Sequence, residues 1–295
     1  MSIPMNWLCI RCHLNRTLEA AKNLGDDEKL TTLSKRLLQL YLDAPENASS
    51  PYLGPATHAL LQEIYGIPDD RMQQEKQDSN RFVLERLDSI RSRIDQAKDP
   101  VYAALQFAVL GNYLDFAALQ GQVSFDTLEI MLEEASHMAL DQPTYEQFCA
   151  DLQKTGRLLV LTDNAGEIVF DMVLAQYIEK AYPYVEITFC VRGGPTHNDA
   201  TMEDVAAIHL PFRTIHNGNR VGGTELSLLS AEAKEAMDSA GVILAKGMGN
   251  TETLAGCGYN IYYAFLVKCE RFVQYFEKPM MTPLFLSERN IKKGN

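Results

Sequence analysis

The chain has 295 residues, of which 27 are Lys or Arg and 39 are Asp or Glu, so its formal net charge is −12. A hydrophobic fraction of 46% and a charged fraction of 22% are typical of a globular protein and argue against disorder. The acidity argues against a nucleic acid or an anionic membrane as a partner bound by bulk electrostatics. It does not exclude a small phosphorylated ligand, since a bound metal ion inverts the local field.

The N-terminal residues lack a basic segment followed by an apolar stretch, so we expect no signal peptide. No stretch approaches the ~18 apolar residues that a membrane span needs. Six cysteines in a chain of this length are too few for a disulfide scaffold. We therefore expect a cytoplasmic protein with reduced thiols.

The first half of the chain predicts helices, because apolar residues recur there at helical spacing. Pro100 is expected to open one of these helices and Ser124 to cap another. The predicted helices cover residues 26–42, 59–65, 80–97, 101–116 and 125–140.

The pattern changes near residue 155, where short apolar runs begin to alternate with helical segments. The predicted strands cover residues 157–163, 185–194, 212–218, 241–250 and 260–269. Strands that alternate with helices predict a parallel, doubly wound sheet. We therefore expect an α/β protein with an all-helical domain over residues 1–154, acting as a lid, and a catalytic α/β domain over 155–295.

Polar residues gather at the carboxyl ends of three of the predicted strands. They are Asp163, Asn164 and Glu167 at the end of the first strand, Arg192, Asn198 and Asp199 at the end of the second, and Lys246 and Asn250 where the fourth strand runs into a loop. Ligands of an open parallel sheet bind at the carboxyl ends of its strands, so we expect these clusters to converge. For any single residue of this set, a helix cap or an Asx turn is the commoner explanation.

The chemistry of these clusters is specific. Asp163, Asn164 and Asp199 offer the hard oxygen ligands that Mg²⁺ or Mn²⁺ prefers. The neighbouring glycines allow backbone N–H groups to approach an anion, and Lys246 and Arg192 add positive charge. A metal, an anion cradle and a cation together favour phosphoryl transfer.

Four segments resemble the signature segments of the DUF89 family, which contains metal-dependent damage-control phosphatases. They are GNYLDF at 111–116, TDNAGE at 162–167, VRGGPTHNDAT at 191–201 and KGMGNTE at 246–252. The CxxC motif at 9–12 and the Lys268-Cys269 pair resemble the prokaryotic, CxxC-bearing subfamily.

The resemblance implies a Rossmann-like α/β/α parallel sheet with a helical domain beside it, and hydrolysis of small phosphate monoesters. Sugar phosphates, nucleotides and phosphopantetheine-like compounds are the expected substrates, as damaged or surplus metabolites. It also implies that Asp163, Asn164 and Asp199 hold a divalent metal, Mg²⁺ or Mn²⁺, with Co²⁺ or Ni²⁺ as alternatives. Lys246 would meet the substrate phosphate. The further residues expected to line the site are Asn112, Asp115, Glu167, Arg192, Asn198 and Asn250.

Several alternatives stay open at this point. Attack by a water that Asp163 or Asp199 orients competes with an aspartyl-phosphate route through Asp163. An S-adenosylmethionine-dependent carboxyl methyltransferase would also suit such a sheet, although Asp163 and Asn164 stand where a glycine-rich cofactor turn is expected. The sequence does not predict an oligomeric state.

The cysteines allow a third function, a non-enzymatic metal or redox module. Cys9 and Cys12 form half of a zinc or redox motif, and Cys269 would add a third thiol if the chain termini meet. Two thiols on one face of an ordinary helix is an equally good explanation of the spacing.

Overall fold

The computed structural model describes residues 2–68, 70–112 and 138–291, and it contains a six-stranded sheet in the order β3-β2-β1-β4-β5-β6. The strands are β1 (Arg157–Leu161), β2 (Glu186–Val191), β3 (Arg213–His216), β4 (Val242–Lys246), β5 (Ile261–Leu266) and β6 (Pro283–Ser287). Neighbouring strands from β3 to β5 pair in parallel, while β6 pairs antiparallel to β5. The expected α/β class and the five parallel strands are confirmed.

Strand β6 was not among the expected strands. Its run of five residues begins with Pro283, which cannot donate a ladder hydrogen bond. Proline is tolerated there because β6 is the edge strand of the sheet and Pro283 is its first residue.

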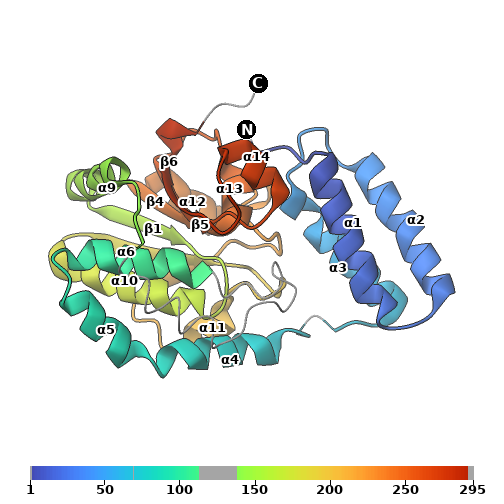
Figure 1. Ribbon diagram of the computed structural model, residues 1–295, viewed down its shortest axis with the longest axis horizontal. Helices are drawn as coiled ribbons and strands as arrows, with labels where there is room; N and C mark the ends of the chain where they lie inside the picture. The colour runs from blue at the N-terminus through green and yellow to red at the C-terminus, as the bar shows by residue number, and fades with distance from the viewer. Residues whose placement is uncertain (1, 69, 113–137, 292–295) are drawn as a thin grey trace.

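The helices flank the sheet and form the N-terminal part of the chain (Figure 1). They are α1 (Trp7–Lys22), α2 (Asp27–Asp43), α3 (Gly54–Tyr65), α4 (Gln73–Leu84), α5 (Leu87–Asp95), α6 (Pro100–Gly111), α9 (Gln142–Thr155), α10 (Glu167–Ala181), α11 (Met202–Ala207), α12 (Ala231–Ser239), α13 (Gly247–Leu254) and α14 (Glu270–Phe276). None of the described helices is long and apolar enough to cross a membrane.

Helix α6 begins where the sequence predicted, at Pro100. The Asp99 side chain caps it by accepting a 3.0 Å hydrogen bond from the backbone N–H of Tyr102, which satisfies a donor that has no partner within the helix. Residues 113–116 of the helix expected over 101–116, and nearly all of the helix expected after Ser124, lie outside the described residues.

The single helix expected over 80–97 is wrong, because the chain forms α4 and α5 with a break between them. At the break the backbone N–H of Arg86 bonds to Val83 O, three residues before it, at 3.0 Å. The guanidinium of Arg86 instead bonds to Phe82 O at 3.0 Å and lies over the Phe82 ring. The carbonyl that a continuing helix would use is therefore taken by a side chain.

The sheet is the middle layer of three, because successive side chains of a strand face opposite sides. Leu158 and Val160 face one buried cluster, which they share with residues of α5, α6, α9 and α10. Leu159 and Leu161 face the other cluster, together with residues of α12, α13 and α14. Helices therefore cover both faces of the sheet, as a parallel sheet requires.

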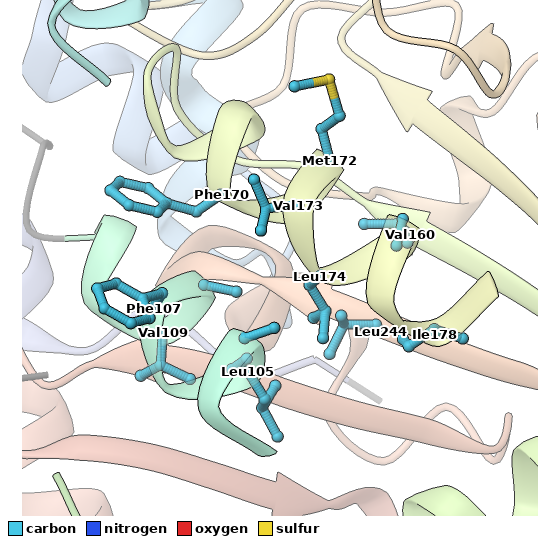
Figure 2. Packing of buried hydrophobic residues seen from close by; sticks show 14 of the residues in the cluster. Leu105, Phe107, Val109, Val160, Phe170, Met172, Val173, Leu174, Ile178 and Leu244 are labelled. Carbon is cyan, nitrogen blue, oxygen red and sulfur yellow. The ribbon is translucent and has the colours of Figure 1, made fainter. Parts of the chain in front are cut away.

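Helices α6 and α10 lie against each other on the first of these faces (Figure 2). The rings of Phe107 and Phe170 stack with centroids 6.4 Å apart, and a Cβ added at Gly111 would lie 2.7 Å from Phe170. Every residue of α6 from Ala103 to Gly111 is buried. This packing places Asn112, at the end of α6, directly beside the residues that follow β1.

The N-terminal helices α1, α2 and α3 have a small buried cluster of their own, which includes Ala21, Leu33, Leu37, Leu60 and Leu61. Figure 1 shows them together at one end of the molecule. The main cluster, in contrast, joins residues from Phe82 to Leu152 with residues of the sheet. Helices α5, α6 and α9 therefore pack with the sheet in one core, and the domain division expected between residues 154 and 155 stays a prediction.

Candidate functional site

The candidate site lies at the carboxyl ends of β1, β2 and β4. From β1 the chain runs outward to β2 and β3 on one side, and β4 and β5 lie on the other side. The strand order therefore reverses between β1 and β4, and this switch point is where open α/β sheets bind ligands.

Two loops are joined at this point by an isolated β-bridge between Asn164 and Asp199. The N–H of Ala165 bonds to Asn198 O at 2.8 Å, and the N–H of Ala200 bonds to Asp163 O at 2.7 Å. The loop after β2 thus folds back onto the loop after β1. This bridge brings together the three residues that the sequence predicted as metal ligands.

The carboxylate of Asp163 is held by amide donors on two sides. Its Oδ2 accepts hydrogen bonds from Asn112 Nδ2 at 2.9 Å and from Asn164 Nδ2 at 3.0 Å. Gly247 lies against it with a φ of +79°, and a Cβ at that position would lie 1.9 Å from Asp163 Oδ2. Only glycine fits there, because the conformation is left-handed and the space is already filled.

Arg192 is buried behind the two aspartates. Its Nε donates to Asp199 Oδ2 at 2.6 Å, and its terminal nitrogens reach Asp163 Oδ1 at 3.5 Å and Asn250 Oδ1 at 3.3 Å. Asn250 is itself fixed, since its Nδ2 donates to Lys246 O at 2.6 Å and Thr162 O at 3.1 Å. Arg192 therefore orients the two aspartates, and Asn250 helps to hold Arg192 in place.

Lys246 lies in a fully buried cluster next to this site. Its Nζ donates to Glu167 Oε1 at 2.6 Å and to Ala108 O at 2.7 Å, and lies 2.9 Å from Asp171 Oδ1. Although burial lowers the pKa of Lys246, Asp171 and Glu167 raise it above its ordinary value. Burial raises the pKa of Asp171 above its ordinary value, against the opposing effect of Lys246.

This arrangement differs from the expectation that Lys246 contacts the substrate phosphate. An ammonium group has three hydrogens, and three protein oxygens already surround Lys246 Nζ. Glu167 links the cluster to the site, because its Oε2 accepts from Asn112 Nδ2 and from Asn164 Nδ2, each at 3.0 Å. Lys246 thus supports the side chains that hold Asp163.

A cavity of about 120 Å³ opens at the bridge between the two loops. Of the residues that the sequence predicted for the site, it is lined by Asn112, Asp163, Asn164, Asn198 and Asp199. The predicted residues Glu167, Arg192, Lys246 and Asn250 are not part of its lining and lie buried behind it. Asp115, also predicted, lies outside the described residues.

The cavity is also lined by residues outside the predicted set of metal-binding and substrate-binding side chains: Arg16, His197, Gly222, Met248, Gly249, Glu252 and Lys268. Lys268 follows the end of β5, and its Nζ donates a hydrogen bond to Asn112 O. The rule that placed Asp163 after β1 applies equally to Lys268, so the position after a strand was a usable signal. Arg16 comes from α1, and no local pattern connects it with the sheet.

The donor set fits a hard divalent cation. Asp163 and Asp199 supply carboxylate oxygens and Asn164 an amide, which are ligands that Mg²⁺ and Mn²⁺ accept. Over the described ranges, no group of three or more His, Cys, Asp or Glu side chains has the spacing of a metal site. A site of two carboxylates and one amide suits a metal that keeps several of its waters, as Mg²⁺ does.

A larger cavity of about 290 Å³ lies beside the first. His197 lines both cavities, and Lys76 and Arg220 line only the larger one. Lys76 is buried and pairs with Asp204 Oδ2 at 2.6 Å. A ligand whose polar group occupies the smaller cavity has this second space next to it.

Cys9 and Cys12 both lie on α1, and the termini do meet: Arg11 of α1 pairs with Glu270 of α14 at 2.6 Å. All six cysteines are free thiols. Burial raises the pKa of the Cys269 thiol to about 12, with Glu252 and Cys9 adding to the shift. The CxxC motif lies on a helix, as one of the two explanations of its spacing supposes, whereas a metal or redox role for Cys9, Cys12 and Cys269 stays a prediction.

The fold and this strand-end cavity define an α/β protein with a cavity at a topological switch point. The family model described as "Damage-control phosphatase ARMT1-like domain" matches residues 6–282. The chain therefore belongs to this family, which confirms the resemblance to DUF89; the finer assignment to a CxxC-bearing subfamily stays a prediction.

Relatives in three archaea match over most of their length. An uncharacterized protein of Methanocaldococcus jannaschii is 30% identical over 281 residues, which cover 91% of this chain and 90% of that protein. A damage-control phosphatase of Archaeoglobus fulgidus is 29% identical over 89% of this chain and 92% of its own. The crystal structure of a DUF89 family protein from Pyrococcus horikoshii matches with a TM-score of 0.82 at 25% identity, covering 98% of this chain and 99% of that one.

Proposed function

We propose that this protein is a metal-dependent phosphatase that hydrolyses small phosphate monoesters. The observation that carries the proposal is the convergence of Asp163, Asn164 and Asp199 on one cavity of about 120 Å³, with Lys268 in the same lining. The relatives named damage-control phosphatases, in Archaeoglobus fulgidus and in Pyrococcus horikoshii, support a phosphatase role.

In this proposal Asp163, Asn164 and Asp199 hold the metal, which is Mg²⁺ or Mn²⁺ on the chemistry of the donors. The bound ion would polarise a phosphoryl oxygen and lower the pKa of a water molecule. Arg192, Asn112 and Asn164 hold the two carboxylates in place through the hydrogen bonds described above. This preorganisation matters because catalysis by charge stabilisation depends on groups that need not move during the reaction.

Lys268 is assigned the contact with the phosphate. Its ammonium group lies at the cavity, beside Asn112, whereas the ammonium of Lys246 lies in the cluster with Glu167 and Asp171. A cation next to the phosphate neutralises charge on its equatorial oxygens. Arg16 adds a second positive side chain to the same lining.

The size of the cavity supports a small phosphoryl group as the ligand. A volume of about 120 Å³ is on the order of four water molecules, so it admits a phosphate but not the body of a large metabolite. The remainder of the substrate would extend past His197 into the larger cavity of about 290 Å³. Sugar phosphates and nucleotides are therefore suitable substrates for a first panel.

The test is phosphate release by the purified full-length protein. After a chelator has removed bound ions, the protein is assayed with added Mg²⁺, Mn²⁺, Co²⁺ or Ni²⁺ on p-nitrophenyl phosphate, sugar phosphates and nucleotides. We expect metal-dependent release, and we expect Asp163→Asn and Asp199→Asn to abolish it. Asp88→Asn, which changes an exposed carboxylate on α5, serves as the control and should retain activity.

The proposal is overturned if no metal stimulates release from any of these substrates. It is also overturned if Asp163→Asn retains both metal binding and activity, because no other described group would then explain the site.

A further inference from the structure

Glu252 is a half-buried acid in the lining of the candidate active-site cavity. It lies on α13, and it shares the cavity of about 120 Å³ with Asp163, Asp199 and Lys268. Its Oε2 is buried and has no hydrogen-bond partner among the described residues. The backbone carbonyl of Glu252 accepts a 2.8 Å hydrogen bond from the N–H of Ile3, so the N-terminal segment closes over this position.

An unpartnered carboxylate oxygen in a buried position is costly when it is charged and rare in folded proteins. The ionisable groups that act on Glu252 are Arg16 of α1 and Arg271 of α14, and Cys9 and Cys269 lie on the same side. Both arginines favour the charged form, but burial outweighs them and raises the pKa of Glu252 to about 8. Burial thus favours the carboxylic acid form of Glu252, which has one O–H to donate.

The other acids of this region are already engaged. Asp163 and Asp199 bond to Arg192, and Glu167 and Asp171 face Lys246 in the buried cluster. Glu252 also lines the cavity, but its Oε2 has no hydrogen-bond partner among the described residues. A phosphoryl group bound at Asp163 would occupy the same cavity that Glu252 lines.

We infer that Glu252 is the general acid that protonates the leaving group, an inference that rests on the proposed function. The oxygen of a water forms a bond to phosphorus, and the bond from phosphorus to the ester oxygen breaks. The carboxyl proton of Glu252 passes to the departing oxygen, so that an alcohol leaves in place of an alkoxide. The proton released by the attacking water then restores the acid, so the reaction consumes one water and yields one alcohol and one phosphate.

The experiment compares two leaving groups. p-Nitrophenolate departs without a proton, whereas the alkoxide of glycerol phosphate requires one. In Glu252→Gln we expect kcat on glycerol phosphate to fall by about 100-fold or more, and kcat on p-nitrophenyl phosphate to fall by less than about 5-fold. Glu235→Gln, an exposed glutamate on α12, is the control and should match the wild type on both substrates.

A pH profile gives a second readout that a structural role would not change. With glycerol phosphate, kcat of the wild type should fall as the pH rises through the pKa of Glu252, and Glu252→Gln should lack this descending limb. If Glu252→Gln does not fold, Glu252→Asp retains the acid but withdraws it by one methylene group. It should then show the loss on glycerol phosphate alone.

The outcomes separate the two proposals. If no metal stimulates phosphate release by the wild type from glycerol phosphate or from any substrate of the first panel, the proposed function is overturned and the inference with it. Equal losses on the two substrates, or no loss on either, overturn the inference and leave the proposed function standing.

Discussion

Lys246 and Glu167 form a fully buried ion pair, with Nζ and Oε1 only 2.6 Å apart. The pair couples the end of β4 to the first turn of α10, since Lys246 is the last residue of β4 and Glu167 the first of α10. The other oxygen of Glu167 accepts from the two amides that hold Asp163. The orientation of Asp163, a candidate metal ligand, thus depends on the buried cation of Lys246 through Glu167.

We predict that Lys246→Met destabilises the protein by about 3–5 kcal/mol, because it leaves Glu167 and Asp171 buried together without a cation. Urea unfolding monitored by circular dichroism measures this loss. A Lys246→Met protein that keeps wild-type stability and has only a raised KM would instead indicate direct contact with substrate.

For Lys268→Met we predict a large loss of activity and only a small loss of stability. The loss of the cation at the cavity should lower kcat/KM by about 100-fold, while the lost hydrogen bond to Asn112 O costs about 1 kcal/mol of stability. Steady-state kinetics and urea unfolding of the same preparation separate the two effects. Lys234→Met, an exposed lysine on α12, is the matched control. Unchanged kinetics in Lys268→Met would contradict the assigned phosphate contact.

Gly247→Ala should disrupt the candidate metal site through one added methyl group. The new Cβ would lie 1.9 Å from Asp163 Oδ2, and the alanine would have to adopt the φ of +79° that Gly247 has. Gly258→Ala is the control, because Gly258 has a similar φ of +89° but nothing within 4 Å of the added atom. We expect Gly258→Ala to cost about 1–2 kcal/mol of stability at full activity, and Gly247→Ala to lose metal-dependent activity as well. Comparable activity in the two variants would show that the contact with Asp163 is unimportant.

Thiol labelling should distinguish the three cysteines near the termini. Cys12 is exposed, whereas burial raises the pKa of Cys9 and raises that of Cys269 to about 12. Since the thiolate is the reactive form, brief iodoacetamide treatment at neutral pH should alkylate Cys12 first. Mass spectrometry of tryptic peptides identifies the site, and Cys12→Ser should remove the early label. Faster labelling of Cys269 than of Cys12 would contradict this prediction.

The pKa of Glu252 also predicts how stability changes with pH. In the folded protein it is about 8, above the ordinary value of 4.5, so the folded state binds the proton more tightly than the unfolded chain. The contribution of Glu252 is therefore fully present below pH 4.5 and is lost as the pH rises through about 8. The unfolding free energy of the wild type minus that of Glu252→Gln should decrease across this range. If this difference in unfolding free energy stays constant from pH 5 to pH 9, the pKa of Glu252 is not raised in the folded protein.

Much of the candidate site could be predicted because parallel strands end at one edge of the sheet. Asp163 and Asn164 follow β1, Asn198 and Asp199 follow β2, and the structure brings all four into one cavity lining. The same rule would have indicated Lys268 after β5. Arg16 could not be found in this way, since its place depends on how α1 packs beside the sheet. Glu252 belongs to the segment 246–252 at the end of β4, but it was not selected from that segment.

Local pattern also failed where a side chain competes with the backbone. The apolar periodicity of residues 80–97 is continuous, yet the guanidinium of Arg86 takes the carbonyl of Phe82 and the helix divides into α4 and α5. Periodicity reports which face is buried, and it carries no information on such a local hydrogen bond.

By itself, the sequence determined the α/β class, the five parallel strands and the polar residues at their ends, because the period of apolar residues and the rules of parallel sheets are local and general. The tertiary structure alone decided which lysine faces the cavity. Lys246 is still inside β4 and shares a face with Val242 and Leu244, so it points at the carboxylates of α10. Lys268 lies past the end of β5, where side chains no longer alternate between the two faces of the sheet, and it lines the cavity.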